Sequence, residues 1–171
     1  MKRIWRHYAD DFGLETRVVR FHNIFGPLGT FDGGREKSPA AICRKVALAK
    51  DNEEIEIWGD GGQTRSYCYV DDCLEGMHRL MKSDHRSPIN LGQDRMVSIN
   101  ELVDIVSSIA GKSVRRRYDL TKPQGVRGRN SDNTRLKEIL QWEPQVSLET
   151  GLANTYQWIS HELGKAYAAS V

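Results

Sequence analysis

The sequence has 171 residues, of which 39% are hydrophobic and 28% are charged, and its formal net charge is +2. This length suits one domain with a buried core, and the balanced charge argues against binding to nucleic acid or to an anionic membrane. The three cysteines are too few for a disulfide framework and do not have the spacing of a metal site. No apolar run is long enough to span a membrane. A cytoplasmic protein is therefore expected.

The first segments of the chain predict an α/β arrangement. Residues 2–13 have the apolar spacing of one helical face and end in Gly13, a residue typical of helix ends. Residues 16–23 are β-branched and aromatic, which predicts a buried strand. A glycine-rich stretch follows, and ligands of open α/β sheets bind at the carboxyl ends of the strands. We therefore expect a ligand site there, with a plain connecting loop as the alternative.

The remaining segments predict further helices and strands in alternation. A helix should start at Ser38 and Pro39, with the serine hydroxyl as its cap, and a second helix should be capped by Asp71 or Asp72. Further helices are expected after the capping box at residues 98–101, over residues 134–140 and after Ser147. Further strands are expected over residues 54–58, 88–92 and 113–120.

Several segments, taken in order, resemble a known enzyme family. FHN followed by GGREK, then CRK, WGDG-x-QTRS and VRGRNSDN look like the segments of GDP-mannose 3,5-epimerases. These enzymes are extended short-chain dehydrogenases of the NAD-dependent epimerase/dehydratase family. The resemblance covers essentially the whole chain. FHN with GGREK, and VRGRNSDN, are far more specific than the GDG-x-Q-x-R pattern, which much of the superfamily shares.

The resemblance implies an α/β fold that corresponds to the carboxyl-terminal part of such an enzyme. Residues 1–37 would be the final helix-strand part of a Rossmann domain with the active-site loop, and residues 38–171 mainly a small α/β substrate-binding domain. The glycine-rich turn that binds the dinucleotide phosphates in the family does not occur here, and its Tyr-x-x-x-Lys pair is expected on the helix just before residue 2. We therefore expect no epimerase activity and no measurable affinity for NAD, the family's cofactor, from this chain alone.

The resemblance also implies the chemistry. Family members oxidise the sugar of GDP-mannose at C4 with NAD, which acidifies the protons at C3 and C5, so that a base and an acid can invert these carbons. Lys37 matches the family's lysine acid/base, and the neighbouring Arg35 is expected to lower its pKa. Without the surrounding motif, a solvated surface lysine would be the simpler interpretation.

Other polar residues match positions that hold the nucleotide sugar in the family. An amide offers both a donor and an acceptor to a sugar, and an arginine can bind phosphate oxygens with two parallel hydrogen bonds. A strand-ending amide and solvated charges are the structural alternatives for these residues. The expected substrate-binding residues are Asn23, Glu36, Ser38, Lys45, Gln63, Thr64, Arg65, Arg129 and, after it, Arg127.

Three hypotheses follow for the function. The leading one is the substrate-binding half of a GDP-mannose 3,5-epimerase, which in the full-length family converts GDP-mannose to GDP-galactose or GDP-gulose. The second is an epimerase or dehydratase for another nucleotide sugar, against which FHN with GGREK argues. The third is a non-catalytic remnant that binds nucleotide sugars. A homodimer, or association with a full-length relative, is expected in either the first or the third case.

Overall fold

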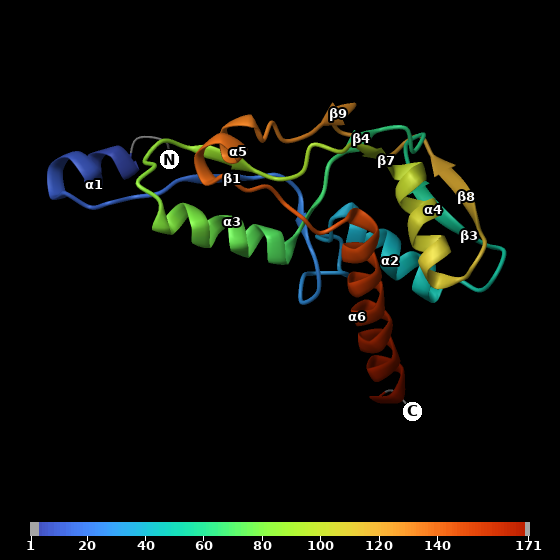
Figure 1. The fold of residues 1–171 in the computed structure, drawn as a ribbon. Helices are drawn as coiled ribbons and strands as arrows, with labels where there is room; N and C mark the ends of the chain where they lie inside the picture. Colours follow the sequence, from blue (N-terminus) through green and yellow to red (C-terminus); the bar gives the residue numbers. More distant parts are fainter. Residues whose placement is uncertain (1–3, 170–171) are drawn as a thin grey trace.

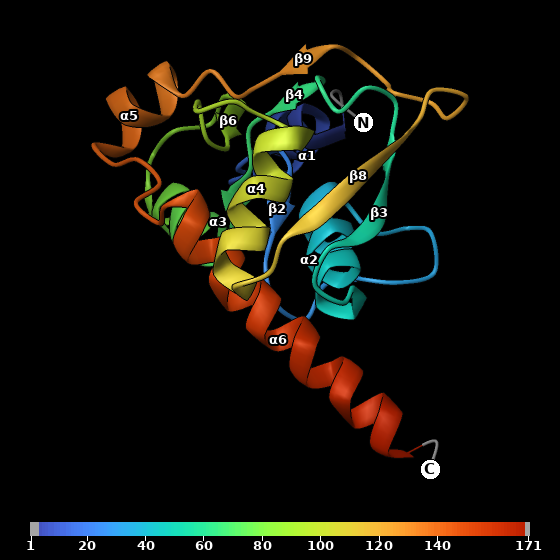
Figure 2. The same ribbon diagram turned by 90° about the vertical axis from the view of Figure 1, so that its right-hand side faces the viewer.

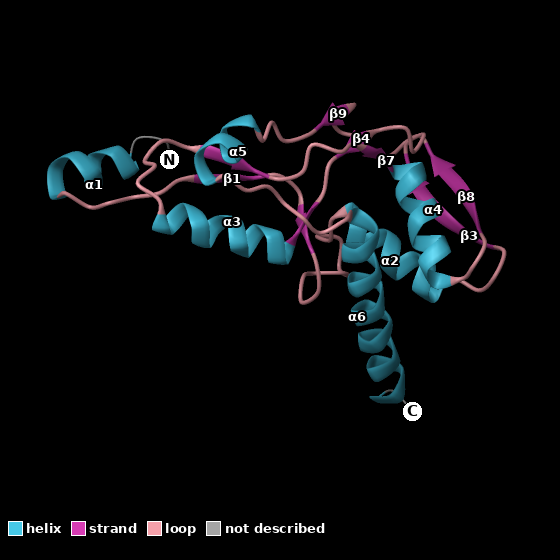
Figure 3. Ribbon diagram, in the orientation of Figure 1, coloured by secondary structure: helices cyan, strands magenta, loops and turns pink. Residues whose placement is uncertain are grey.

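The structure is a computed structural model that describes residues 4–169. Its helices and strands alternate along the chain, as Figures 1 and 3 show. None of the described helices combines the length and the apolar composition that crossing a bilayer requires. In chain order the elements are α1 (Ile4–Phe12), β1 (Val19–Phe21), β2 (Ile24–Phe25), α2 (Ser38–Leu48), β3 (Glu53–Trp58), β4 (Thr64–Arg65), β5 (Cys68–Tyr69), α3 (Val70–Lys82), β6 (Ile89–Leu91), β7 (Val97–Ser98), α4 (Ile99–Ala110), β8 (Val114–Asp119), β9 (Gly128–Arg129), α5 (Thr134–Leu140) and α6 (Leu148–Ala169).

Parallel strand pairs bring distant segments of the chain together. In the pair of β1 and β6, Val19 is the register partner of Ile89 and Phe21 that of Leu91. β2 pairs with β5, and β3 with β8, also in parallel, whereas β4 lies between antiparallel β7 and parallel β9. Parallel neighbours need long crossover connections, which the helices provide here. The predicted α/β class is therefore confirmed.

Buried apolar side chains form two clusters. One joins β6, α3 and α5 through Leu91, Leu80 and Leu136, and β1 packs against it. The larger cluster joins α2, α4 and α6, with Val46 and Leu102 fully buried, and these three helices pack against one another, as can be followed in Figure 2. β1 therefore packs with elements from beyond residue 37. The division of the chain into residues 1–37 and 38–171 remains a prediction.

The first strand and the second helix differ from the sequence-based expectation. Residues 2–3 of the first expected helix lie outside the described residues. The buried strand expected over residues 16–23 is shorter and is not buried, since β1 covers Val19–Phe21 and Phe21 is 47% exposed. Asn23, with a φ of 44°, separates β1 from β2. The predicted capping role of Ser38 is wrong. Lys37 occupies the N-cap position of α2, and no side chain caps that helix end.

The ends of α4 confirm the local signals in the sequence. The Ser98 hydroxyl accepts a hydrogen bond from the Glu101 backbone N–H, and the Glu101 carboxylate accepts one from the Ser98 backbone N–H. Gly111 ends the helix with a φ of 62°, a left-handed conformation that favours glycine. Each of these contacts involves residues within a few positions of one another. They can therefore be recognised from the sequence.

The predicted cap of α3 is wrong, and Asp72 has another role. Tyr69 is the N-cap residue of α3, and no side chain caps the helix. Asp72 is buried, and its carboxylate oxygens accept hydrogen bonds from the backbone N–H groups of Gln145, at 3.0 Å, and Val146, at 2.8 Å. The carboxylate thus holds the segment that leads into α6 against the start of α3.

Lys112 closes the carboxyl end of α2 from a distant part of the chain. Its Nζ donates to the backbone carbonyl oxygens of Val46, Ala47 and Ala49 at 3.1, 3.0 and 2.7 Å. The last carbonyl groups of a helix have no partner within the helix, and a cation is also favourable near that end. The ammonium group therefore replaces several missing helix hydrogen bonds.

We expect Lys112→Met to lower the free energy of unfolding by about 2 kcal/mol, because hydrogen bonds to a charged group are lost while the alkyl volume is retained. Urea denaturation followed by far-UV circular dichroism measures this change. Lys50→Met, at an exposed lysine in the same region, is the control and should be nearly neutral. Equal effects of the two substitutions would contradict the capping role.

Candidate functional site

A cleft of about 550 Å³ lies beside the amino terminus of α2, between this helix and the ends of β3 and β4. Its volume is in the range of sites that bind small molecules and cofactors. The cleft gathers residues from distant parts of the chain, and some of them were expected from the sequence. The expected site residues that line it are Asn23, Glu36, Lys37, Ser38, Lys45, Gln63 and Arg65.

Arg44 holds the loop that precedes α2. Its Nε donates to the backbone carbonyl oxygen of Phe31 at 2.8 Å, and its Nη2 donates to Glu36 Oε1 at 3.0 Å. Gly33 and Gly34 have φ values of 88° and 81°, so the loop turns through conformations that other residues rarely adopt. Arg44 therefore fixes both sides of the turn on α2. The sequence analysis did not identify this residue, although it stands next to Lys45 in the CRK motif.

Lys37 lies where the loop meets α2. It is exposed and lines the cleft together with Gly34 and Ser38. Arg35 is also exposed but lies outside the cleft lining. The structure therefore places the expected acid/base lysine at the cleft. The influence of Arg35 on its pKa remains a prediction.

Asn23 connects the first part of the chain to the cleft. Its side-chain Nδ2 donates to the backbone carbonyl oxygen of Ser66 at 2.9 Å, while the residue also lines the cleft. The Asn23 amide thus has a structural role, since it bonds a backbone group, and such a role was the alternative to substrate binding. This contact fixes the position of Asn23 at the cleft wall, and its predicted role in substrate binding remains open to test.

Two acceptor atoms beside the cleft have no hydrogen-bond partner among the described residues. They are Glu36 Oε2 and Gln63 Oε1, and both are buried. Burial by itself would raise the pKa of Glu36, but hydrogen bonds from backbone N–H groups and from Arg44 outweigh it and hold this pKa below its usual value. Glu36 is therefore a carboxylate at neutral pH. A buried acceptor without a partner is costly, which favours a site that a ligand completes.

Two cationic side chains line the cleft as predicted. Lys45 Nζ donates to the backbone carbonyl oxygen of Glu56 at 2.6 Å, and Arg65 Nη1 donates to the backbone carbonyl oxygen of Thr64 at 2.7 Å. Burial lowers the pKa of Lys45, and the nearby Glu56 carboxylate partly offsets this effect. Both groups retain further donors, so the arrangement suits an anionic ligand such as a diphosphate.

Three of the expected substrate-binding residues lie outside the cleft lining. Thr64 is in β4, where its hydroxyl contacts Met96 Sδ at 3.8 Å. Arg127 forms an ion pair with Asp60, with Nη1 2.8 Å from Oδ2. Arg129 is exposed in β9, at the position that pairs with Arg65 in β4. Arg129 is thus next to a residue that lines the cleft, whereas the Arg127 guanidinium is already paired.

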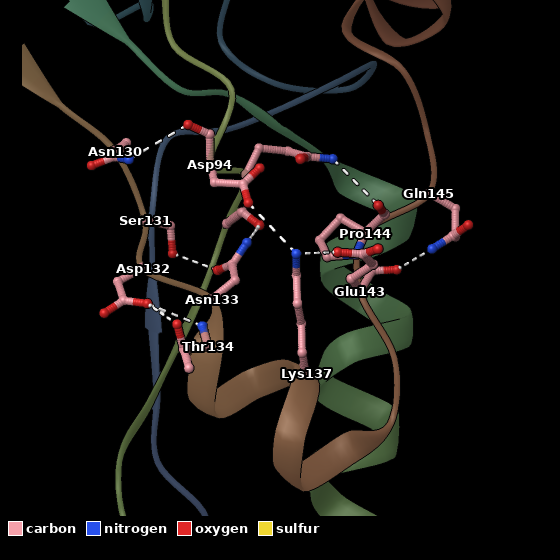
Figure 4. Close-up of polar contacts among 12 residues, drawn as sticks. Asp94, Asn130, Ser131, Asp132, Asn133, Thr134, Lys137, Glu143, Pro144 and Gln145 are labelled. Carbon is pink, nitrogen blue, oxygen red and sulfur yellow. Dashed lines mark hydrogen bonds and ion pairs between the residues drawn. The ribbon is translucent and has the colours of Figure 1, made fainter.

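The second half of the VRGRNSDN motif stabilises the fold. As Figure 4 shows, the Ser131 hydroxyl donates to Asn133 Oδ1 at 2.7 Å, and Asp132 Oδ1 accepts hydrogen bonds from the backbone N–H and the hydroxyl of Thr134. Asn133 Nδ2 in turn donates to the backbone carbonyl oxygen of Gly92 at 2.7 Å. Ser131 and Asn133 are buried. These residues therefore fasten the start of α5 to the end of β6.

Some residues of the cleft were not identified from the sequence. Trp58 is half exposed at the end of β3, and its indole N–H donates to Glu56 Oε1 at 3.0 Å. Pro123 and Gln124 approach from the loop after β8, and Tyr67 forms part of the wall between β4 and β5. The loop contributions could not be found from the sequence, because their position depends on how β8 pairs with β3. For Tyr67, the alternation of aromatic residues around it was the only signal in the local sequence.

Two features of the described residues bear on the expected lack of NAD affinity, which remains a prediction. β5 leads directly into α3 with no glycine between them, whereas a dinucleotide site needs a glycine-rich turn at such a junction. The sequence contains one Tyr-x-x-x-Lys spacing, Tyr118 to Lys122, but it starts in β8, and Lys122 Nζ lies 5.7 Å from the centre of the Trp58 ring. Residues 4–169 also hold no group of three or more His, Cys, Asp or Glu side chains arranged to bind a metal.

Comparisons with known proteins identify similar sequences and structures. Residues 1–92 match the profile of the NAD dependent epimerase/dehydratase family. GDP-mannose 3,5-epimerase 1 of Oryza sativa subsp. indica is 51% identical over 164 residues, which cover 96% of this chain and 43% of that protein. GDP-mannose 3,5-epimerase of Arabidopsis thaliana is 50% identical over 167 residues, or 98% of this chain and 44% of that protein.

A solved structure gives the same result for the fold. UDP-glucose 4-epimerase of Thermotoga maritima with UDP-glucose superposes with a TM-score of 0.83 at 30% identity, over 92% of this chain and 50% of that chain. The present chain therefore spans about half the length of the relatives that it matches.

Proposed function

Because the chain belongs to the NAD dependent epimerase/dehydratase family, we propose that it carries the nucleotide-sugar-binding half of a GDP-mannose 3,5-epimerase. The observation that carries this proposal is the composition of the cleft. The exposed Lys37, the cations Lys45 and Arg65, and two buried acceptors that have no partner among the described residues line a space of about 550 Å³. The similarity to GDP-mannose 3,5-epimerases supports GDP-mannose as the ligand.

Each side chain has a proposed role in binding or proton transfer. Lys45 and Arg65 bind the diphosphate, with Arg129 beside Arg65, and Arg127 as a second candidate. Glu36 and Gln63 line the cleft and are proposed to contact the ligand. Inversion of C3 and C5 requires removal and return of a proton at carbon, and Lys37 is the proposed group for one of these transfers.

The hydride-transfer half of the reaction is proposed to rely on other residues, since neither the glycine-rich turn nor the Tyr-x-x-x-Lys pair of the family was recognised in the sequence. The chain alone is therefore expected to bind the sugar nucleotide more weakly than a full-length relative does, and a homodimer or a complex with such a relative is proposed for activity. Cys43, Cys68 and Cys73 are buried free thiols, which suits a reducing compartment and supports a cytoplasmic location.

Arg65→Ala is expected to weaken binding of GDP-mannose at least about tenfold, because a hydrogen bond to a charged group contributes roughly 1.5–3 kcal/mol. Isothermal titration calorimetry of the chain with GDP-mannose measures this change. Arg115→Ala, at an exposed arginine of β8 outside the cleft, is the matched control and should leave the dissociation constant unchanged. An unchanged dissociation constant for Arg65→Ala would remove Arg65 from the site.

Another nucleotide sugar is the second candidate ligand, because the Thermotoga maritima structure was obtained with UDP-glucose. The same titration with UDP-glucose separates the two possibilities. Tighter binding of UDP-glucose than of GDP-mannose would favour a 4-epimerase or a related enzyme. Failure of the chain to bind either compound would contradict the proposed function.

A further inference from the structure

Tyr67 lies between the cleft and the core. Its side chain is 6% exposed, it belongs to the cleft lining, and its ring packs edge-to-face on Phe25 with the ring centres 6.2 Å apart. Its phenol oxygen is closed off from solvent and has no hydrogen-bond partner among the described residues. A buried hydroxyl without a partner is destabilising, and native proteins seldom retain one without a reason.

The surroundings of the phenol oxygen place it beside the cleft. Burial raises the pKa of Tyr67, and the Ser38 hydroxyl and the Arg65 guanidinium lie near enough to oppose that rise. The Ser38 hydroxyl does not, however, reach hydrogen-bonding geometry. Ser38 and Arg65 both line the cleft. Tyr67, Ser38 and Arg65 therefore belong to the same part of the cleft lining.

Tyr69 is a buried tyrosine outside the cleft lining, and it can be compared with Tyr67. It is also 6% exposed, and its ring also packs on Phe25, with the centres 5.7 Å apart. The Tyr69 hydroxyl, however, accepts a hydrogen bond from Asn154 Nδ2 at 3.3 Å. Of these two buried tyrosines, only Tyr67, which lines the cleft, has a hydroxyl without a partner among the described residues. The missing partner does not follow from burial alone.

We propose that Tyr67 is a positioning residue of the nucleotide-sugar site, whose hydroxyl orients the Ser38 hydroxyl towards the sugar. Since the phenol oxygen is closed off from solvent, it acts through Ser38. Binding of the ligand turns the Ser38 hydroxyl so that it accepts a hydrogen bond from Tyr67 and donates one to a sugar oxygen. Ser38 directly follows Lys37, so this contact also sets the distance between the sugar and the lysine. The inference rests on the proposed function of the cleft.

The test compares Tyr67→Phe with Tyr69→Phe in titrations of the chain with GDP-mannose and with GDP. Tyr67→Phe should weaken binding of GDP-mannose about fivefold and leave binding of GDP unchanged, because only the sugar contact depends on the hydroxyl. In the absence of ligand, urea denaturation should show no loss of stability for Tyr67→Phe, since no hydrogen bond is removed. Tyr69→Phe should do the reverse, with unchanged affinities and a lower denaturation midpoint.

A double-mutant cycle with Ser38→Ala tests whether Tyr67 acts through Ser38. If it does, Tyr67→Phe should have no further effect on GDP-mannose affinity in the Ser38→Ala background. Additive effects would overturn the inference, as would an unchanged GDP-mannose affinity of Tyr67→Phe, or a ligand-free loss of stability as large as that of Tyr69→Phe. If the unmodified chain binds neither GDP-mannose nor GDP, both the proposed function and this inference are wrong.

Discussion

Lys37→Met is expected to reduce proton exchange at the sugar carbon that this lysine serves by about 10²–10⁴-fold, the usual contribution of a general acid/base. Methionine keeps most of the side-chain volume but cannot carry a proton. The experiment needs an enzyme in which this chain is joined to the amino-terminal half of an active relative. Deuterium incorporation from heavy water at C3 and C5 of GDP-mannose, followed carbon by carbon by NMR, measures the exchange.

Lys50→Met is the matched control for this experiment, since Lys50 is exposed and lies outside the cleft lining. It should exchange protons at the rate of the unmodified enzyme. If Lys37→Met also incorporates deuterium at C3 and C5 at that rate, Lys37 is a surface lysine or a ligand contact and has no role in proton transfer. The assignment of the acid/base group in this half of the fold would then be wrong.

Asp72→Ala should lower the free energy of unfolding by about 3 kcal/mol, because two backbone N–H groups lose a charged acceptor that is itself buried. These are the N–H groups of Gln145 and Val146, and the alanine offers them no replacement. Urea denaturation with linear extrapolation measures the change. The effect should be the largest of any single carboxylate removed from α3.

Asp71→Ala is a closely matched control, since Asp71 is the neighbouring aspartate in the first turn of α3 and is exposed. Its removal should change the free energy of unfolding by less than about 0.5 kcal/mol. Equal losses for the two variants would mean that the charge of the first helical turn matters, through the helix dipole, and that the contact with residues 145–146 does not.

Proximity in the sequence explains which expectations were confirmed. The capping box of Ser98 and Glu101 and the left-handed Gly111 depend on neighbours within a few residues, and they lie where the pattern placed them. The α/β class and the likeness to the carboxyl-terminal part of an extended short-chain dehydrogenase are also confirmed, by parallel strand pairing and by the superposition on a 4-epimerase. The order of short motifs was sufficient for these conclusions.

The expectations that failed, or that the sequence did not supply, depend on partners far along the chain. Asp72 was expected to cap its own helix, but it binds backbone groups of residues 145 and 146. The ion pair of Arg127 with Asp60 was not supplied by the sequence, and the predicted phosphate contact of Arg127 remains a prediction. A carboxylate has several possible partners of similar energy. Which one it meets is decided by the packing of the elements.

The sequence by itself determined the helices with strong local caps, the α/β class and the motif residues from Asn23 to Arg65 that line the cleft. Only the tertiary structure decided that Arg44 anchors the loop before α2, that Asn133 fastens α5 to the end of β6 and that the Tyr67 hydroxyl is buried without a partner among the described residues. The physical reason is that local signals arise from contacts within one turn of the backbone. The partners of a buried polar group, in contrast, are fixed only when distant strands and helices pack together.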